Sequence, residues 1–180
     1  MNGPLLSGTE IDAAQARLFE RFAALGIAAP TVTYPTHKTV DEGKLLRGAM
    51  AGTFTKNLLL RDKKNRLFLL SIHENREIDL RTLHIRIGAS GRLGFASQDR
   101  VIEVLGVMPG ALTPLGLIND SKGLVTAVID YCLLGADQVN FHPLVNTKST
   151  GLTPSCLLDF IRSCGREPLI VDFDANLPAP

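Results

Sequence analysis

Hydrophobic residues near the start of the chain recur every three or four positions, which is the spacing of one helix face. The pattern predicts a helix with Thr9 as N-cap and Gly26 as stop, whose apolar face is Ile11, Ala14, Leu18, Phe22 and Leu25. Capping signals predict further helices that begin at Thr39, Asp79, Ser97 and Thr153. The last three are expected to end at Gly88, Gly106 and Gly165.

Shorter apolar runs, bounded by polar residues, glycine or proline, predict strands. These strands are expected at residues 31–34, 57–60, 67–72, 123–129, 138–141 and 169–171. The second and third flank the polar turn of residues 62–65 and predict a hairpin. Both arms are almost continuously apolar, so we expect a sheet that is buried on both faces.

The predicted helices and strands are mixed without strict alternation, which favours an α+β fold around a mixed, curled sheet. With 180 residues, of which 45% are hydrophobic, the chain suffices for one domain with its own core. We expect this domain to span residues 9–174, with short flexible tails at 1–8 and 175–180.

The net charge and the cysteine content exclude some classes of protein. The formal net charge is +1, so no global positive excess steers the chain to DNA or to many phosphates. A protein that grips the tip of an RNA needs only a few local cations. The three cysteines lack CxxC spacing, and neither a signal-like start nor a membrane-length apolar run is present, so we expect a cytoplasmic protein.

The sequence lacks the motifs of several kinds of catalytic site. The four histidines, His37, His73, His84 and His142, are scattered, and no HExxH or Cys/His cluster occurs. Phosphate-loop, dinucleotide-binding and GxSxG motifs are also missing. We therefore predict neither a metal nor a cofactor.

Three polar features lie in apolar surroundings, and each allows a structural or a functional interpretation. Lys56 and Asn57 lie at the start of a buried strand. In the structural interpretation, Lys56 is a lysine at a strand end whose ammonium reaches solvent. In the functional interpretation, this ammonium lies beside the Asn57 amide at the mouth of a pocket. The loop of Gly110, Ala111, Leu112, Thr113 and Pro114 is a tight connection or a backbone cradle for an anion or a carbonyl oxygen. His142 follows an apolar strand, in a structural or a binding role.

Taken together, these features resemble the YbaK/ProX family of editing domains associated with prolyl-tRNA synthetases. The matching blocks are residues 55–64, 95–97, 105–120 and 140–147, in order, within a likeness that runs from Glu10 to Phe173. The resemblance implies a barrel-like sheet flanked by helices. It also implies functional roles for Lys56, Asn57, His142 and the 110–114 loop.

The blocks at residues 117–120 and 142–147 favour the ProX-type branch, which clears alanyl-tRNA(Pro) in trans. The expected partners are the acceptor end of tRNA(Pro) and prolyl-tRNA synthetase. In the mechanism we infer, loop N–H groups hold the ester carbonyl and Lys56 holds a phosphate. Asn57 and His142 bind the aminoacyl or ribose end, and Ala111 and Leu112 limit the size of the amino acid.

Three alternatives remain open at the level of sequence. The first is a cysteinyl-tRNA(Pro) deacylase of the same family. The second is a non-catalytic module that binds the tRNA end or the synthetase. The third is an unrelated hydrolase or small-molecule binder on the same fold.

Overall fold

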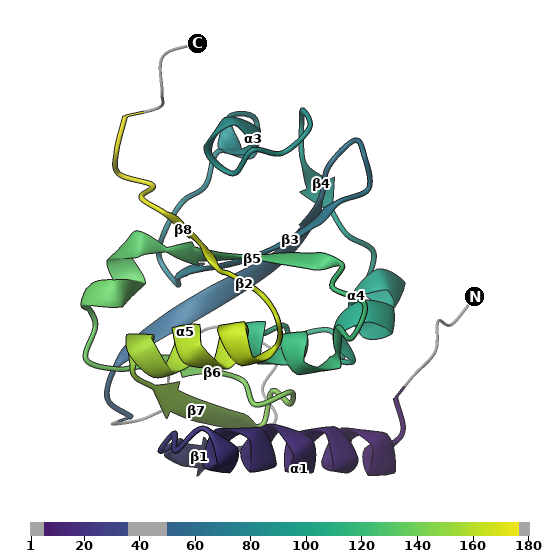
Figure 1. Ribbon diagram of the computed structural model, residues 1–180, viewed down its shortest axis with the longest axis vertical. Coiled ribbons are helices and arrows are strands. Elements are labelled where there is room, and N and C mark those ends of the chain that lie inside the picture. The colour runs from purple at the N-terminus through teal and green to yellow at the C-terminus, as the bar shows by residue number, and fades with distance from the viewer. Residues whose placement is uncertain (1–5, 36–49, 177–180) are drawn as a thin grey trace.

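The computed structural model describes residues 6–35 and 50–176 of the chain (Figure 1). The helix predicted to begin at Thr39 and the outer parts of both predicted tails lie outside these residues. The described residues form the helices α1 (Gly8–Ala24), α3 (Leu83–Arg86), α4 (Gln98–Leu105) and α5 (Pro154–Ser163), and the 3-10 helices η1 (Pro114–Asn119) and η2 (Tyr131–Gly135).

The helix caps explain where the predicted helices were right and where they were wrong. Helix α1 begins before Thr9, because Ser7 is its N-cap and forms a capping box with Glu10. Ser97 caps α4 as predicted, and Gly106 ends it in the left-handed conformation. The helix expected from Asp79 to Gly88 is reduced to the single turn of α3, whose N-cap, Thr82, makes no capping bond through its side chain.

The strands are β1 (Thr31–Thr33), β2 (Thr53–Arg61), β3 (Leu67–His73), β4 (Gly94–Phe95), β5 (Val125–Asp130), β6 (Val139–Phe141), β7 (Lys148–Leu152) and β8 (Leu169–Val171). The predicted hairpin is confirmed as β2 and β3, which pair antiparallel from Thr55–His73 to Arg61–Leu67. Strands β4 and β7 were missed: the first has two residues, and the second contains Lys148, Ser149 and Gly151 in place of an apolar run.

The strands form one mixed sheet in the order β1-β7-β6-β2-β3-β5-β8, with β4 beside β2. Strand β2 joins the two halves, because its start pairs parallel with β6 and the rest pairs antiparallel with β3. Among the described strands, β1 and β8 are the two edges, so the sheet is not closed into a barrel. The predicted α+β class with a mixed sheet flanked by helices is confirmed.

Apolar side chains pack on both faces of the sheet, in two cores of unequal size. The larger core lies between the sheet and α1, α5 and η1, and it receives Leu59 and Leu69. The smaller core lies on the face covered by α3 and receives Leu60 and Leu70 (Figure 1). Burial on both faces is complete for β3 up to His73, whereas β2 is half-buried over its first six residues. Those six residues therefore remain open to function.

The β2–β3 turn is held by a buried carboxylate. Asp62 accepts hydrogen bonds from the backbone N–H groups of Lys64, Arg66 and Ser90 at 2.8, 2.9 and 2.9 Å, and from Arg66 Nε at 2.8 Å. Burial opposes the charged form, but the bonds from Ser90, Arg66 and Lys64 outweigh it and lower the pKa of Asp62 to about 2. This carboxylate thus fixes both the hairpin turn and the segment leading into β4.

Candidate functional site

Lys56 and Asn57, predicted to act together, occupy adjacent positions of β2. Neighbouring residues of a strand point to opposite faces of the sheet. Asn57 shares its face with Leu59 and the larger core, whereas Lys56 shares its face with Leu60 and the smaller core. The two side chains therefore start on opposite sides of the sheet.

Asn57 connects β2 to the predicted loop. Its Nδ2 donates to the carbonyl oxygen of Leu112 at 3.0 Å. Because a carbonyl can only accept, this contact fixes the orientation of the amide and turns Oδ1 elsewhere. Oδ1 is buried and has no hydrogen-bond partner. The structure thus brings Asn57 and the 110–114 loop together, and it leaves one strong acceptor unused.

The loop begins with a tight turn. Ala111 N donates to Met108 O at 3.0 Å, and Gly110 has φ +87°, as the third residue of a type II turn requires. Thr113 then caps η1 by accepting from Leu115 N. Within the described part of the chain, the N–H groups of Gly110, Leu112 and Thr113 have no acceptor. The loop therefore contains unpaired backbone N–H groups, whereas the N–H of Ala111 is already in use.

His142 follows β6 directly. Its Nδ1 lies 2.9 Å from the carbonyl oxygen of Lys148, so Nδ1 carries the proton in this contact. The segment after His142 reaches the loop, since a Cβ placed on Gly110 would lie 3.5 Å from Asn146 Nδ2. Between them, the buried Leu144 has φ +68°, a conformation that costs energy for a branched residue. His142 thus belongs to a strained segment that borders the loop.

Lys56 is half-buried, and its side chain makes no hydrogen bond or ion pair with another described residue. On the edge of β2 away from β3, β6 pairs only with Thr53 and Phe54, and β4 only with Leu60 and Arg61. Between these pairings no described strand covers the edge. The flexible Lys56 side chain can meet a ligand held by the loop only around this open edge.

Ser71 lies opposite Asn57 on β3 and is not among the residues predicted for the site. Its hydroxyl is fully buried and also lacks a hydrogen-bond partner. The feature of the sequence that could have indicated Ser71 is its hydroxyl, which interrupts the apolar run of residues 67–72.

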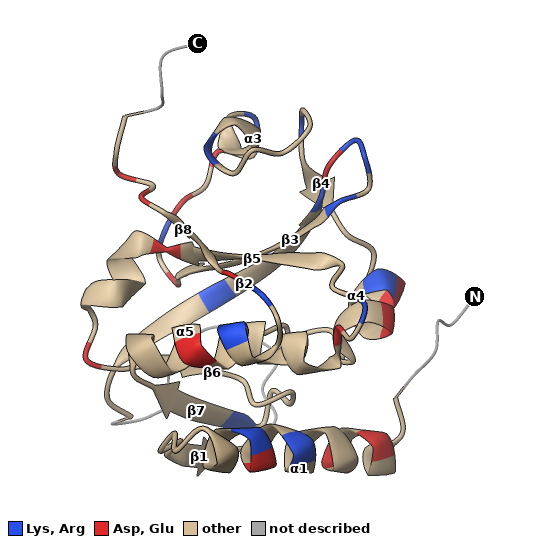
Figure 2. Cartoon of the chain, viewed as in Figure 1, with Lys and Arg blue, Asp and Glu red and all other residues tan. Residues whose placement is uncertain are grey.

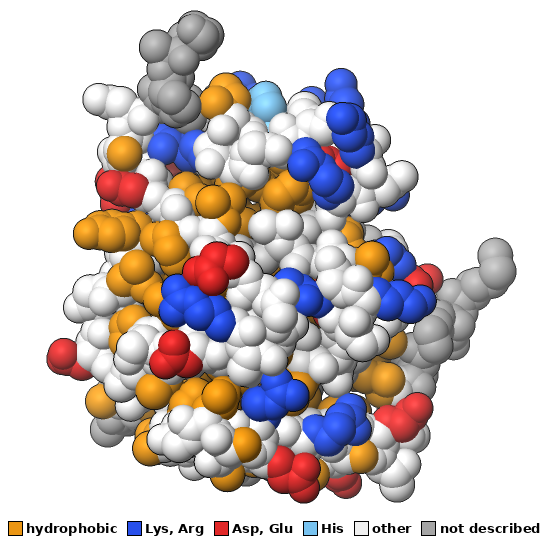
Figure 3. Space-filling model, viewed as in Figure 1, with side chains coloured by type: hydrophobic (Ala, Val, Ile, Leu, Met, Phe, Trp, Pro, Cys, Tyr) orange, Lys and Arg blue, Asp and Glu red, His pale blue; other side chains and the backbone are white. Residues whose placement is uncertain are grey.

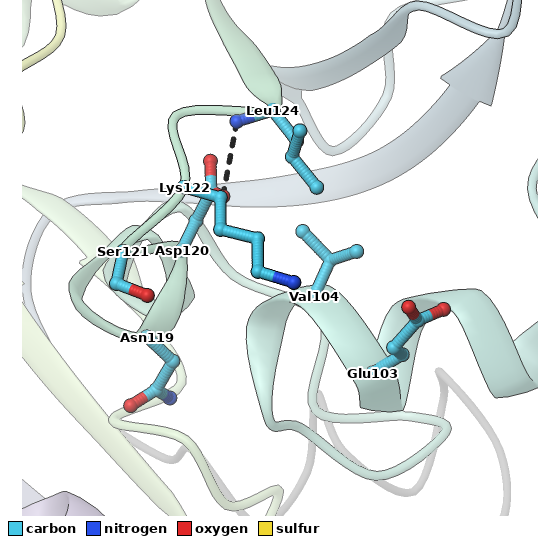
Figure 4. A pocket seen from close by; sticks show the side chains of 7 residues that line it. All are labelled: Glu103, Val104, Asn119, Asp120, Ser121, Lys122 and Leu124. Carbon is cyan, nitrogen blue, oxygen red and sulfur yellow. Dashed lines mark hydrogen bonds between the residues drawn. The ribbon is translucent and has the colours of Figure 1, made fainter.

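The block at residues 117–120 has a structural explanation. Asn119 Nδ2 donates to Leu105 O, and its Oδ1 accepts from Arg17. The Asp120 carboxylate accepts from the N–H groups of Leu124 and Val125 and from the half-buried Arg166. A small pocket of about 110 Å³ lies beside this turn, between Lys122 and Glu103 of α4 (Figure 4). This pocket is separate from the Asn57–loop contact. Both carboxylates that line it are already bonded, Asp120 as described and Glu103 to Arg100.

Two further expectations concern what the described residues contain. In residues 6–35 and 50–176, no group of three or more His, Cys, Asp or Glu side chains is arranged to hold a metal ion. No helix in the same residues is long and apolar enough to cross a bilayer.

Comparison with known proteins identifies the family. A model of the aminoacyl-tRNA editing domain matches residues 35–160. The prolyl-tRNA synthetase associated domain-containing protein 1 of Bos taurus is 37% identical over 175 residues, covering 95% of this chain and 100% of its own. The prolyl-tRNA editing protein ProX of Acetoanaerobium sticklandii is 31% identical over 157 residues, covering 87% of this chain and 94% of its own.

The fold is found in a solved structure as well. A crystal structure of a proposed trans-editing enzyme for prolyl tRNA synthetase superimposes with a TM-score of 0.68 at 22% identity, over 93% of this chain and 99% of that one. The editing-domain match covers more than half of the chain, and two relatives above 30% identity extend over most of it. The chain belongs to the aminoacyl-tRNA editing domain family of the YbaK/ProX type.

Proposed function

We propose that the protein is a trans-editing deacylase that hydrolyses alanyl-tRNA(Pro). The observation that carries the proposal is the contact between Asn57 Nδ2 and Leu112 O, beside the unpaired N–H groups of Gly110, Leu112 and Thr113. Donors fixed in this way can stabilise the negative charge that develops on a carbonyl oxygen during ester hydrolysis. The names of ProX and of the associated domain protein connect the same fold to prolyl-tRNA.

In this mechanism the aminoacyl ester supplies most of the reactivity. Its carbonyl oxygen lies against the free N–H groups of the loop, and water attacks the carbonyl carbon. The bond from this carbon to the ribose oxygen then breaks, the ribose oxygen takes up a proton from the attacking water, and the free amino acid leaves. Lys56 reaches around the open edge of β2 to a phosphate of the terminal adenosine. His142, held by Lys148 O, binds the ribose end of the ester.

Alanine is selected by size. A synthetase site that is built for proline rejects a smaller residue by only about 1–3 kcal/mol, which a second, smaller site corrects by hydrolysis. Ala111 is buried and Leu112 half-buried beside Asn57, and these two side chains would limit the room for the amino acid.

The tRNA would approach over a surface that we call the basic corner, formed by the exposed Arg61, Lys63, Lys64, Arg66 and Arg92 (Figures 2 and 3). The nearby acid, Asp62, is buried and pairs with Arg66, so the other four cations keep their charge without an ion pair to a described residue. Phe95, 63% exposed on β4, adds a face on which a base can stack. From there β4 leads towards the open edge of β2.

The proposal is tested by single-turnover deacylation of tRNA(Pro) charged with alanine, serine, cysteine or proline. Fast hydrolysis of the alanyl ester and slow hydrolysis of the prolyl ester are expected. Preference for the cysteinyl ester would identify the other deacylase branch, and tRNA binding without turnover would identify a binding module. Either result refutes the proposal. Lys56→Ala should slow the alanyl reaction without changing the melting temperature.

A further inference from the structure

Two of the buried polar atoms that lack a partner lie side by side in the candidate site. Among the described residues, four buried side-chain nitrogen or oxygen atoms have no hydrogen-bond partner: Asn57 Oδ1, Ser71 Oγ, His84 Nδ1 and Arg166 Nε. The first two belong to residues that face each other across the β2–β3 ladder. An unpaired buried polar group is costly, so two such neighbours call for an explanation.

The register brings these two side chains close together. Asp62 N donates to Arg66 O, and Glu74 N donates to Phe54 O, so the backbone-bonded pairs of the ladder involve the even-numbered residues of β2. Asn57 and Ser71 therefore form a non-hydrogen-bonded pair, in which opposing side chains approach most closely. Their Cβ atoms are expected about 4.5–5.5 Å apart.

Towards the hairpin turn the surroundings of the pair are apolar. Leu59 follows Asn57 on the same face of β2, Leu69 precedes Ser71 on β3, and Ile129 lies beside Ser71 on β5. All three side chains are buried. On the other side of the pair, the next residues on this face are Thr55 and the half-buried His73, so the apolar contacts lie on the side towards the hairpin turn.

The chemistry of the two oxygens restricts what they can bind. Asn57 Nδ2 is held by Leu112 O, so Oδ1 can only accept a hydrogen bond. The Ser71 hydroxyl can accept as well, and together they suit a group that donates more than one N–H. In an aminoacyl ester, the α-amino group next to the carbonyl is such a donor.

We propose that Asn57 Oδ1 and Ser71 Oγ bind the α-ammonium of the aminoacyl group, and this inference rests on the proposed deacylase function. The loop N–H groups then hold the oxygen of the carbonyl group that is bonded to the same α-carbon. The side chain of the amino acid packs against the apolar residues next to the pair. Both oxygens are shielded from solvent in the free protein, so the groups that cover them must move when the ester binds.

The test compares two esters of the same tRNA(Pro), alanyl and propionyl, which differ only in the amino group. Wild-type protein should hydrolyse the alanyl ester much faster. Ser71→Ala should lower its kcat/KM on the alanyl ester by about 10- to 100-fold, the range for a hydrogen bond to a charged group. The same variant should hydrolyse the propionyl ester at a rate within about twofold of the wild type, because this ester has no amino group that could bond to Ser71. Ser71→Cys, which keeps the size but is a weak acceptor, should behave in the same way and serves if the alanine variant does not fold.

Ser149→Ala is the matched control, because this serine is also buried but its hydroxyl bonds to Tyr34. It should leave the ratio of the two rates unchanged. Equal losses on both esters in the Ser71 variants, or a wild-type protein that cleaves both esters equally well, would overturn the inference. Wild-type protein that leaves alanyl-tRNA(Pro) intact would overturn the proposed function, and the inference with it.

Discussion

Asp62 and Asn57 lie five positions apart on the same hairpin, and both carry a buried polar atom. The carboxylate of Asp62 receives four hydrogen bonds from three residues. The amide of Asn57 makes one bond, from its nitrogen, and its oxygen has none. Because the two residues share a hairpin, the type of structure around them does not account for this difference.

Under the proposed function, this difference separates groups that hold the fold from groups that are kept ready for a ligand. A buried carboxylate with all its bonds made stabilises the native state, and removing it leaves several donors unpaired. A buried acceptor without a donor is a cost to the free protein that binding can recover. Asp62 should therefore control stability and Asn57 activity, and the following predictions test that division.

The largest effect is expected from Asn57→Ala. The variant loses the bond that places Leu112 and the oxygen that faces Ser71, so the rate of alanyl-tRNA(Pro) hydrolysis should fall about 100-fold or more, as for other lost site donors and acceptors. The free energy of unfolding should change by no more than about 1 kcal/mol, the value of one ordinary hydrogen bond. Kinetics and chemical denaturation of the same sample measure both. A large loss of stability would show that Asn57, like Asp62, mainly stabilises the fold.

Asp62→Ala should show the opposite pattern. Three backbone N–H groups and Arg66 Nε lose their acceptor, so the free energy of unfolding should fall by about 2–4 kcal/mol. The hydrolysis rate per folded molecule should stay near that of the wild type. Reduced activity at full folding would show that the hairpin turn also serves the site.

The dependence of stability on pH should identify the same carboxylate. The pKa of Asp62 is lowered to about 2 in the folded protein, below its ordinary value near 4, so the ionised group stabilises the fold. That contribution is fully present above about pH 4 and is lost as the pH falls towards 2. Asp62→Asn should remove this part of the acid sensitivity. Urea denaturation between pH 5 and 2 compares the two proteins, and parallel curves would contradict the assignment.

The last and smallest loss of activity is expected from Gly110→Ala, which should also have a small effect on stability. A methyl group there meets no closer atom than Asn146 Nδ2, at 3.5 Å, so no clash is expected. The φ of +87° is unfavourable for alanine and should cost about 1 kcal/mol or slightly more. If the loop backbone touches the substrate, hydrolysis should fall by more than this loss of stability explains. Unchanged turnover per folded molecule would leave Gly110 with a purely structural role.

The sequence patterns located most of the fold because its signals are local. The apolar arms of the hairpin, the Ser97 cap with its Gly106 stop, and Pro154 at the first position of α5 were all identified from neighbouring residues. Strand β7 escaped, because Lys148, Ser149 and Gly151 pair through their backbone and lack an apolar pattern. The start of α1 was misplaced by two positions, since Ser7 and Thr9 are both suitable caps.

The candidate site could be predicted only in part, because it depends on contacts between distant segments. The sequence indicated Asn57 and the 110–114 loop, but not that the amide nitrogen would be bound to Leu112 O, 55 positions away. It suggested that Lys56 acts beside Asn57, whereas strand alternation directs their side chains to opposite faces. Ser71 could not be distinguished from an ordinary buried serine until the register placed it opposite Asn57.

The position of β2 at the junction of the sheet also has a consequence for synthesis of the protein. The hairpin with β3 joins neighbouring segments, but β6 pairs with β2 from more than 80 residues further along the chain. Contacts of such long sequence separation form late and slow folding. On the ribosome, the hairpin can form early, but the segment that holds His142 docks only after most of the chain has emerged. A nascent chain therefore completes its candidate site only after β6 and His142 have left the ribosome.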